Sequence, residues 1–202
     1  MTRRSGQSLV LNAALVVVFG LFAVANLMSW RDTGRPVGLG AVLLEGTTAV
    51  LFLVRRPPRE TSGRVVAWVS AFAALSLALA RPTTHPNPGP WWTFEVLQAL
   101  GFVIAIAALV FLGRSFGVVA AIRRVKTAGL YRLVRHPVYS GYLAAYTGYV
   151  LENPSARNLW LFAVGTAAQI VRIREEERVL GRDPAYRAYS VRVRYRLIPF
   201  VY

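Results

Sequence analysis

Four long apolar runs dominate this sequence and restrict the folds available to it. Each run approaches or exceeds the roughly 20 residues that a helix needs to cross a hydrocarbon core about 30 Å thick. They cover residues 9–30, 37–54, 65–80 and 94–112. With 55% hydrophobic and 16% charged residues, the chain is too apolar for an ordinary soluble domain. We expect a polytopic α-helical membrane protein, and the first run is too long for a cleaved signal peptide.

The charge of +15 comes almost wholly from arginine, with Lys126 as the only lysine. Arginines gather before the first run and in the links 55–64 and 114–136, whereas the links 31–36 and 81–92 are poor in net positive charge. The positive-inside rule places the three basic segments in the cytoplasm. Anionic lipid accounts for this distribution, so we expect membrane lipids and no nucleic acid as partners.

Metal binding is not expected from this composition. The chain has no cysteine and only two histidines, His85 and His136, which leaves no thiolate ligand and too few imidazoles for a structural zinc site. His85 falls in a proline-rich link on the expected outer side, where we interpret it as solvated. We therefore expect no metal cofactor.

Two shorter apolar stretches follow Pro137, at residues 138–151 and 158–171, and an Asn153-Pro154 turn separates them. Each is short for a lone crossing, so a tight helical hairpin packed on the other spans is the simplest structure. The hairpin returns Arg172 to the side of the 114–136 segment. We expect an all-α fold of four long spans, this C-terminal hairpin and a cytoplasmic amphipathic tail, in which residues 191–197 alternate like a strand or an extended segment.

The segment before the hairpin and the helix after it carry residues suited to ligand binding. Pro137 fits the first turn of a helix, so His136 begins the helix near free backbone donors that favour an anion. Tyr131 and Tyr139 offer flat rings and hydroxyls, although an aromatic belt at the membrane interface would also explain them. Arg172 and Glu176 are four residues apart and share a helix face, and a simple surface ion pair is the alternative interpretation.

Glu45 lies midway along the second apolar run. A charged carboxylate there would cost roughly 2.5 to 3.5 kcal/mol on insertion scales, so we expect it to face the bundle interior. A neutral, hydrogen-bonded packing role is favoured over a substrate role.

Several short motifs between residues 113 and 199 occur in a fixed order and spacing. They are Gly129-Leu130-Tyr131-Arg132, Arg135-His136-Pro137-Val138-Tyr139-Ser140-Gly141, Glu176-Glu177-Arg178-Val179-Leu180, Tyr186 with Tyr189, and Arg196-Leu197-Ile198-Pro199. In combination they resemble the isoprenylcysteine carboxyl methyltransferases and the related phospholipid methyltransferases, which are integral membrane enzymes. The resemblance covers a little over two fifths of the chain. Because the sequence has no internal repeat, we expect one membrane domain over 1–202, with generic transmembrane helices in 1–92 and, as the resemblance implies, a methyltransferase-like catalytic region in 93–202.

The resemblance also implies a cofactor, S-adenosylmethionine, and assigns residues to it. By position, the cofactor-binding set is Lys126, Tyr131, His136, Pro137, Val138, Tyr139 and Glu176, with a weaker match at Arg123, Arg124 and Val125. Arg172 matches the arginine assigned to the substrate carboxylate, which makes it the candidate catalytic residue. Glu177 is interpreted as structural.

Methyl transfer from a sulfonium is an in-line displacement with an activated donor, so alignment can supply up to roughly 7 to 11 kcal/mol of the catalysis. A carboxylate acceptor is already ionised at neutral pH, and Arg172 could orient it with two parallel hydrogen bonds. We therefore predict carboxyl O-methylation of a lipophilic small-molecule or prenylated acceptor at the cytoplasmic face. A thiol or an amine acceptor stays open, and the alternatives are an NADPH-dependent enzyme like the membrane sterol reductases or a non-catalytic lipid-binding protein.

Overall fold

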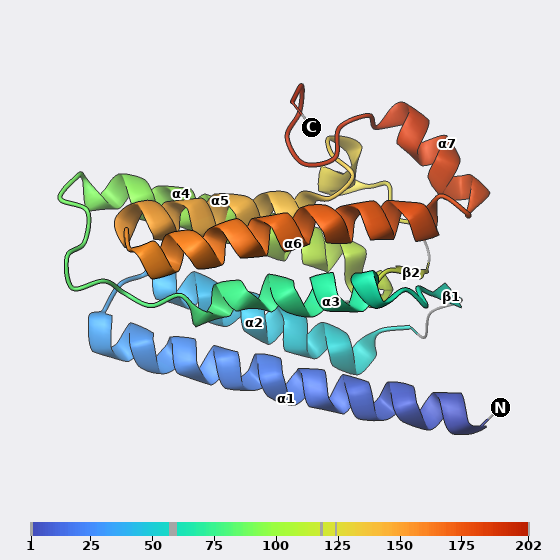
Figure 1. Cartoon of the computed structure of the whole chain (residues 1–202), viewed down its shortest axis with the longest axis horizontal. Helices are drawn as coiled ribbons and strands as arrows, with labels where there is room; N and C mark the ends of the chain where they lie inside the picture. The colour runs from blue at the N-terminus through green and yellow to red at the C-terminus, as the bar shows by residue number, and fades with distance from the viewer. Residues whose placement is uncertain (1, 57–59, 118, 124, 202) are drawn as a thin grey trace.

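The computed structural model describes residues 2–56, 60–117, 119–123 and 125–201, which form a bundle of helices running alternately up and down (Figure 1). Arg59 and Arg124 lie outside the described residues. The helices are α1 (Thr2–Thr33), α2 (Val37–Val54), α3 (Val65–Ala73), α4 (Trp91–Leu112), α5 (Pro137–Glu152), α6 (Ala156–Leu180) and α7 (Pro184–Arg192), with 3-10 helices η1 (Ala74–Leu79), η2 (Gly113–Ser115) and η3 (Gly129–Arg132). The all-helical membrane fold is thus confirmed.

Three of the described helices are long and apolar enough to cross a membrane: Val10–Thr33, Val37–Val54 and Trp91–Ser115. The expectation of four long spans is corrected at residues 65–80. There the α-helix ends at Ala73, and Ala74–Leu79 continue as a 3-10 helix. A 3-10 helix rises about 2 Å per residue, so these residues cover more length than an α-helix would, and they pack against α6.

The expected C-terminal hairpin is present as α5 and α6 (Figure 1). Ser155 caps α6 by accepting a hydrogen bond from the Asn158 backbone N–H at 3.1 Å, and the buried Asn158 side chain donates to the carbonyls of Arg81 and Asn153. These bonds fix the turn against the neighbouring link. Because α6 runs to Leu180, it carries Arg172 and Glu176 beyond its apolar half.

The tail differs from the extended segment expected at 191–197. Asp183 caps α7 by accepting from the Ala185 N–H at 2.8 Å, and Val191 and Arg192 complete that helix. Only the residues after Arg192 leave the helix. The alternation of apolar residues and arginines is therefore carried by the end of a short helix and the loop after it, not by a strand.

The basic links all lie at one end of the bundle, the end that carries α7 (Figure 1). A two-residue antiparallel pair, β1 (Glu60–Thr61) with β2 (Ala121–Ile122), joins two of these links. A further backbone hydrogen bond of 2.8 Å from Arg56 to Arg114 connects them, and Arg64 forms a 3.0 Å ion pair with Glu175 on α6. The link 113–136 is thereby held over the ends of α2 and α6.

Helices α4 and α5 approach closely through small residues. A Cβ at Gly141 would lie 2.5 Å from the backbone nitrogen of Ala105 and 2.6 Å from the carbonyl oxygen of Gly101. Gly101 faces Gly141 and Ala145 in the same way. Small residues four apart on each helix permit such backbone contact in membrane bundles. This contact fixes α5, and with it Tyr139, relative to the long span α4.

Candidate active site

A cavity of about 170 Å³ opens at the basic end of the bundle, between α2, α5, α6 and the 113–136 link. Most of the residues predicted to bind the cofactor line it. These are Lys126, Tyr131, His136, Val138, Tyr139 and Glu176, together with Arg172, Arg123 and Val125. Pro137 is buried in the first turn of α5 and lies behind this wall. The structure therefore brings two separate sequence segments to one cavity.

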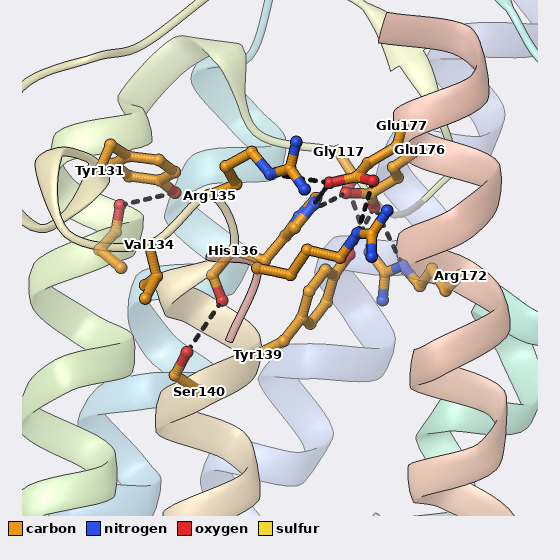
Figure 2. A network of polar contacts seen from close by, with 12 residues as sticks. Gly117, Tyr131, Val134, Arg135, His136, Tyr139, Ser140, Arg172, Glu176 and Glu177 are labelled. Carbon is orange, nitrogen blue, oxygen red and sulfur yellow. Dashed lines mark hydrogen bonds and ion pairs between the residues drawn. The ribbon is translucent and has the colours of Figure 1, made fainter. Parts of the chain in front are cut away.

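Arg172, Tyr139 and Glu176 form the centre of the cavity wall (Figure 2). The Tyr139 hydroxyl donates a hydrogen bond to Glu176 Oε1, and Arg172 Nε lies 3.3 Å from the same oxygen. The Arg172 guanidinium carbon sits 5.1 Å from the centre of the Tyr139 ring, a cation–π distance. Arg172 also donates to the Gly117 carbonyl at 3.3 Å, and the residue is 8% exposed. A guanidinium in this position is held by three contacts, with further N–H groups left to face the cavity.

Glu177 lies beside Glu176 on α6, and Figure 2 shows it next to Arg135 and His136. Its carboxylate lies 3.1 Å from Arg135 Nε and 3.2 Å from His136 Nε2, and it accepts a hydrogen bond of 2.7 Å from Arg196 Nε. Burial opposes its charge, but the hydrogen bonds from His136 and Arg196 and the charge of Arg135 prevail and lower the pKa of Glu177 to about 2. These contacts support the interpretation of Glu177 as structural.

His136 lies between the two neighbouring carboxylates. Its Nδ1 is 3.8 Å from Glu176 Oε2, and its ring stacks on the Tyr139 ring with centroids 5.7 Å apart. Through Nε2 it contacts Glu177, as above. The imidazole therefore positions the Tyr139 ring relative to the two carboxylates of α6.

The backbone donors just before the start of α5 are engaged by the C-terminal tail. The N–H groups of Arg135 and His136 each donate at 2.9 Å, to the carbonyls of Tyr195 and Arg196 respectively. Ser140 Oγ donates to the Leu197 carbonyl at 2.6 Å. The C-terminal tail thus closes over the start of α5, a role that the Arg196-Leu197-Ile198-Pro199 motif did not indicate by itself.

Two tyrosines of α7 complete the outer wall. The Tyr189 hydroxyl donates to the Tyr131 carbonyl at 2.8 Å, which fixes η3. The Tyr186 hydroxyl is buried, lines the cavity and has no hydrogen-bond partner among the described residues. A buried hydroxyl without a partner is costly, so this group is suited to meet a polar ligand atom.

The cavity continues inward past the residues that the motifs indicated. Glu45 and Thr48 of α2, Tyr142 and Tyr146 of α5 and Gln169 of α6 line it, as do Phe19 and Phe22 of α1. Sequence reasoning did not assign these residues to the site, and only Glu45 carried a signal, as a charged group inside an apolar run.

The fold and this cavity define a helical membrane protein with a polar, partly enclosed site at one end of its bundle. Residues 89–183, which run from just before α4 to the residue before α7, match the family model of the phospholipid methyltransferases. The match confirms the predicted resemblance to these membrane methyltransferases and supports methyltransferase activity, for which the family generally uses S-adenosylmethionine. No curated protein matches the sequence.

Proposed function

We propose that this protein transfers a methyl group from S-adenosylmethionine to the carboxylate of a lipophilic acceptor, such as an isoprenylcysteine-like acid, at the cytoplasmic membrane face. The observation that carries the proposal is the convergence of Arg172, Tyr139 and Glu176 on one cavity wall. It brings a buried cation for the acceptor next to an anion for the cofactor.

The donor set of the cavity fits S-adenosylmethionine, which supplies an activated methyl group on a positively charged sulfur. Glu176 offers an anion to the cationic parts of the cofactor, while Lys126 and Arg123 offer cations to its carboxylate. Tyr131, Val138 and Tyr139 offer surfaces for the heterocycle, and the unpartnered Tyr186 hydroxyl offers a further polar contact.

Arg172 is the residue that we assign to the acceptor carboxylate. Of its five N–H groups, one donates to Gly117, and Nε faces Glu176. The remaining terminal N–H groups can hold a carboxylate in a bidentate pair. Because such an acceptor is already ionised at neutral pH, this chain needs no general base for the reaction, and positioning is its main contribution.

A second cavity of about 220 Å³ supports a lipophilic acceptor. It lies between α5, α6 and η1, with an apolar lining that includes Leu77, Leu143 and Phe162. It shares Tyr139, Tyr142, Tyr146 and Gln169 with the first cavity. A hydrocarbon chain in this groove would place its polar end near Arg172.

The proposal is tested by separating cofactor binding from acceptor use. We expect Glu176→Gln and Tyr139→Ala to weaken S-adenosylhomocysteine binding by about 10-fold or more in calorimetry, because each removes a contact to a charged or aromatic group of the wall. We expect Arg172→Ala to reduce transfer of a labelled methyl group to a farnesylcysteine analogue far more than it changes that affinity.

Three results would overturn parts of the proposal. Unchanged affinity in both Glu176→Gln and Tyr139→Ala would contradict the cofactor assignment. Methylation of a thiol or an amine from a membrane lipid extract, with no carboxylate product, would contradict the acceptor class. Tight binding of reduced NADP without binding of S-adenosylhomocysteine would favour the reductase instead.

A further inference from the structure

Glu45 is an unpaired carboxyl group that faces the inner end of the site cavity. It lies on α2, outside the region that matches the methyltransferase family. Leu44 and Thr48, on either side of Glu45 along α2, are buried against the bundle. Among the residues that the structure describes, no side chain or backbone group forms a hydrogen bond or an ion pair with Glu45, although a packing role would require one.

The free-energy cost of placing Glu45 in a membrane span without a partner indicates that it binds a ligand. A carboxyl group in a membrane span without a partner is expensive, and such groups in membrane proteins face substrate paths or water-filled cavities. Thr48, which lies one helical turn from Glu45 and lines the same cavity, donates instead to the Leu44 carbonyl at 2.8 Å. Glu45 therefore keeps its acceptor capacity for a molecule inside the cavity.

Because Glu45 and Arg172 line one cavity, a single ligand that contacts both must carry a polar group for each of them. Tyr142 and Tyr146 of α5 line this cavity together with Glu45 and Arg172. Tyr142 and Tyr146 lie one and two helical turns deeper along α5 than Tyr139, which contacts Arg172. At about 1.5 Å per residue, these two rings extend the cavity wall roughly 5 to 10 Å along α5 beyond Tyr139.

Resting on the proposed function, we infer that Glu45 is a specificity-determining residue that accepts a hydrogen bond from an N–H or O–H group of the acceptor whose carboxylate Arg172 holds in the same cavity. The acceptor is therefore a lipophilic acid with a hydrogen-bond donor close to its carboxylate, such as an amide. The apolar groove between α5 and α6 takes the hydrocarbon chain, and the donor arm extends toward Glu45.

A matched pair of acceptors tests this inference. Acetylglycyl-farnesylcysteine carries a glycine N–H five bonds from its carboxyl carbon, whereas acetylsarcosyl-farnesylcysteine replaces that hydrogen with a methyl group. We expect the wild-type protein to prefer the glycyl compound by about 10-fold in kcat/KM, since one buried hydrogen bond has about that effect. The preference should fall to near one in Glu45→Leu and be partly restored in Glu45→Gln, whose amide oxygen still accepts.

The controls separate recognition from folding. Glu45→Leu should keep the affinity for S-adenosylhomocysteine and should melt no lower than the wild type, because it removes a buried group without a partner. Thr47→Leu, a change on α2 at a residue that does not line the cavity, should keep the glycyl preference. An unchanged preference in Glu45→Leu, or an equal loss of activity on both acceptors, would overturn the inference.

Failure of the proposed function would be visible separately. If the wild type methylates neither compound, the carboxylate assignment is wrong, and Glu45 is then tested by the thermal stabilisation that each compound gives to the S-adenosylhomocysteine-bound protein. A larger stabilisation by the glycyl compound in the wild type, and no difference in Glu45→Leu, would support its role. Equal or absent stabilisation in the wild type would reject it.

Discussion

Glu176 and Glu177 are adjacent in sequence but have different environments. Consecutive residues of a helix point about 100° apart, so one carboxylate faces the cavity while the other meets Arg135, His136 and Arg196. His136 contacts both. We interpret Glu177 as a structural residue that connects α6 to the start of α5 and to the C-terminal tail. Glu176, Tyr139 and Arg172 are then the side chains available to contact a ligand.

The lowered pKa of Glu177 gives a prediction about the pH dependence of stability. Its pKa is lowered from 4.5 to about 2, so its ionised form contributes stability that is fully present above about 4.5 and is lost as the pH falls toward about 2. We expect Glu177→Gln to lower the melting temperature at pH 7 by several degrees and to flatten the loss of stability between pH 4.5 and 3. Thermal melts in detergent at pH 7, 4.5 and 3 would measure both effects.

The exposed Asp32, at the opposite end of the bundle, supplies the control for this prediction. Asp32 forms no ion pair among the residues described. We therefore expect the melting temperature of Asp32→Asn to fall between pH 4.5 and 3 as much as that of the wild type. If Glu177→Gln kept the wild-type stability at pH 7, the carboxylate would not be holding the tail and α5 together.

The close contact between α4 and α5 explains the glycine of the Tyr139-Ser140-Gly141 motif and gives a prediction about elements. A Cβ at Gly141 would meet backbone atoms of α4, which cannot move aside like the end of a flexible side chain. We expect Gly141→Ala to separate the helices, to destabilise the protein by about 1 to 3 kcal/mol and to weaken S-adenosylhomocysteine binding through Tyr139. Gly20→Ala on α1, where a Cβ would meet nothing within 4 Å, should change neither property. Equal behaviour of the two variants would show that the α4–α5 contact does not position the site.

Which elements could be predicted from the sequence depended on how local their signals are. The Asn153-Pro154 turn predicted the α5–α6 hairpin because proline and asparagine act within a few residues. The 3-10 segment at Ala74–Leu79 carries no such signal, since its composition is that of an ordinary apolar helix. The fold of the tail over Arg135 and His136 depends on backbone bonds between residues about 60 positions apart, and the contribution of α1 and α2 to the cavity depends on packing. No local sequence pattern predicts either the fold of the tail or the contribution of α1 and α2 to the cavity.

On the scale of the whole molecule, the cavity and the basic links occupy the same end of the bundle (Figure 1). The link 81–90 and the α5–α6 turn lie at the other end, where Glu152 pairs with Arg35 and accepts a 2.8 Å hydrogen bond from Gln98. The cavity thus lies at the basic end of the bundle, and the buried Glu152 carboxylate links helices at the opposite end. From the positive-inside rule, we propose that the basic end, both termini and the site face the cytoplasm.

This orientation can be tested with single cysteines, because the chain has none of its own. Thr84, in the 81–90 link, and Ala188, on α7, are both exposed and lie at opposite ends of the bundle. With a membrane-impermeant maleimide on intact cells, we expect labelling of Thr84→Cys and not of Ala188→Cys, which should react only after the membrane is opened. The reverse pattern would place the cavity on the outer face, away from the cytoplasmic supply of S-adenosylmethionine, and would contradict the proposed function at its starting point.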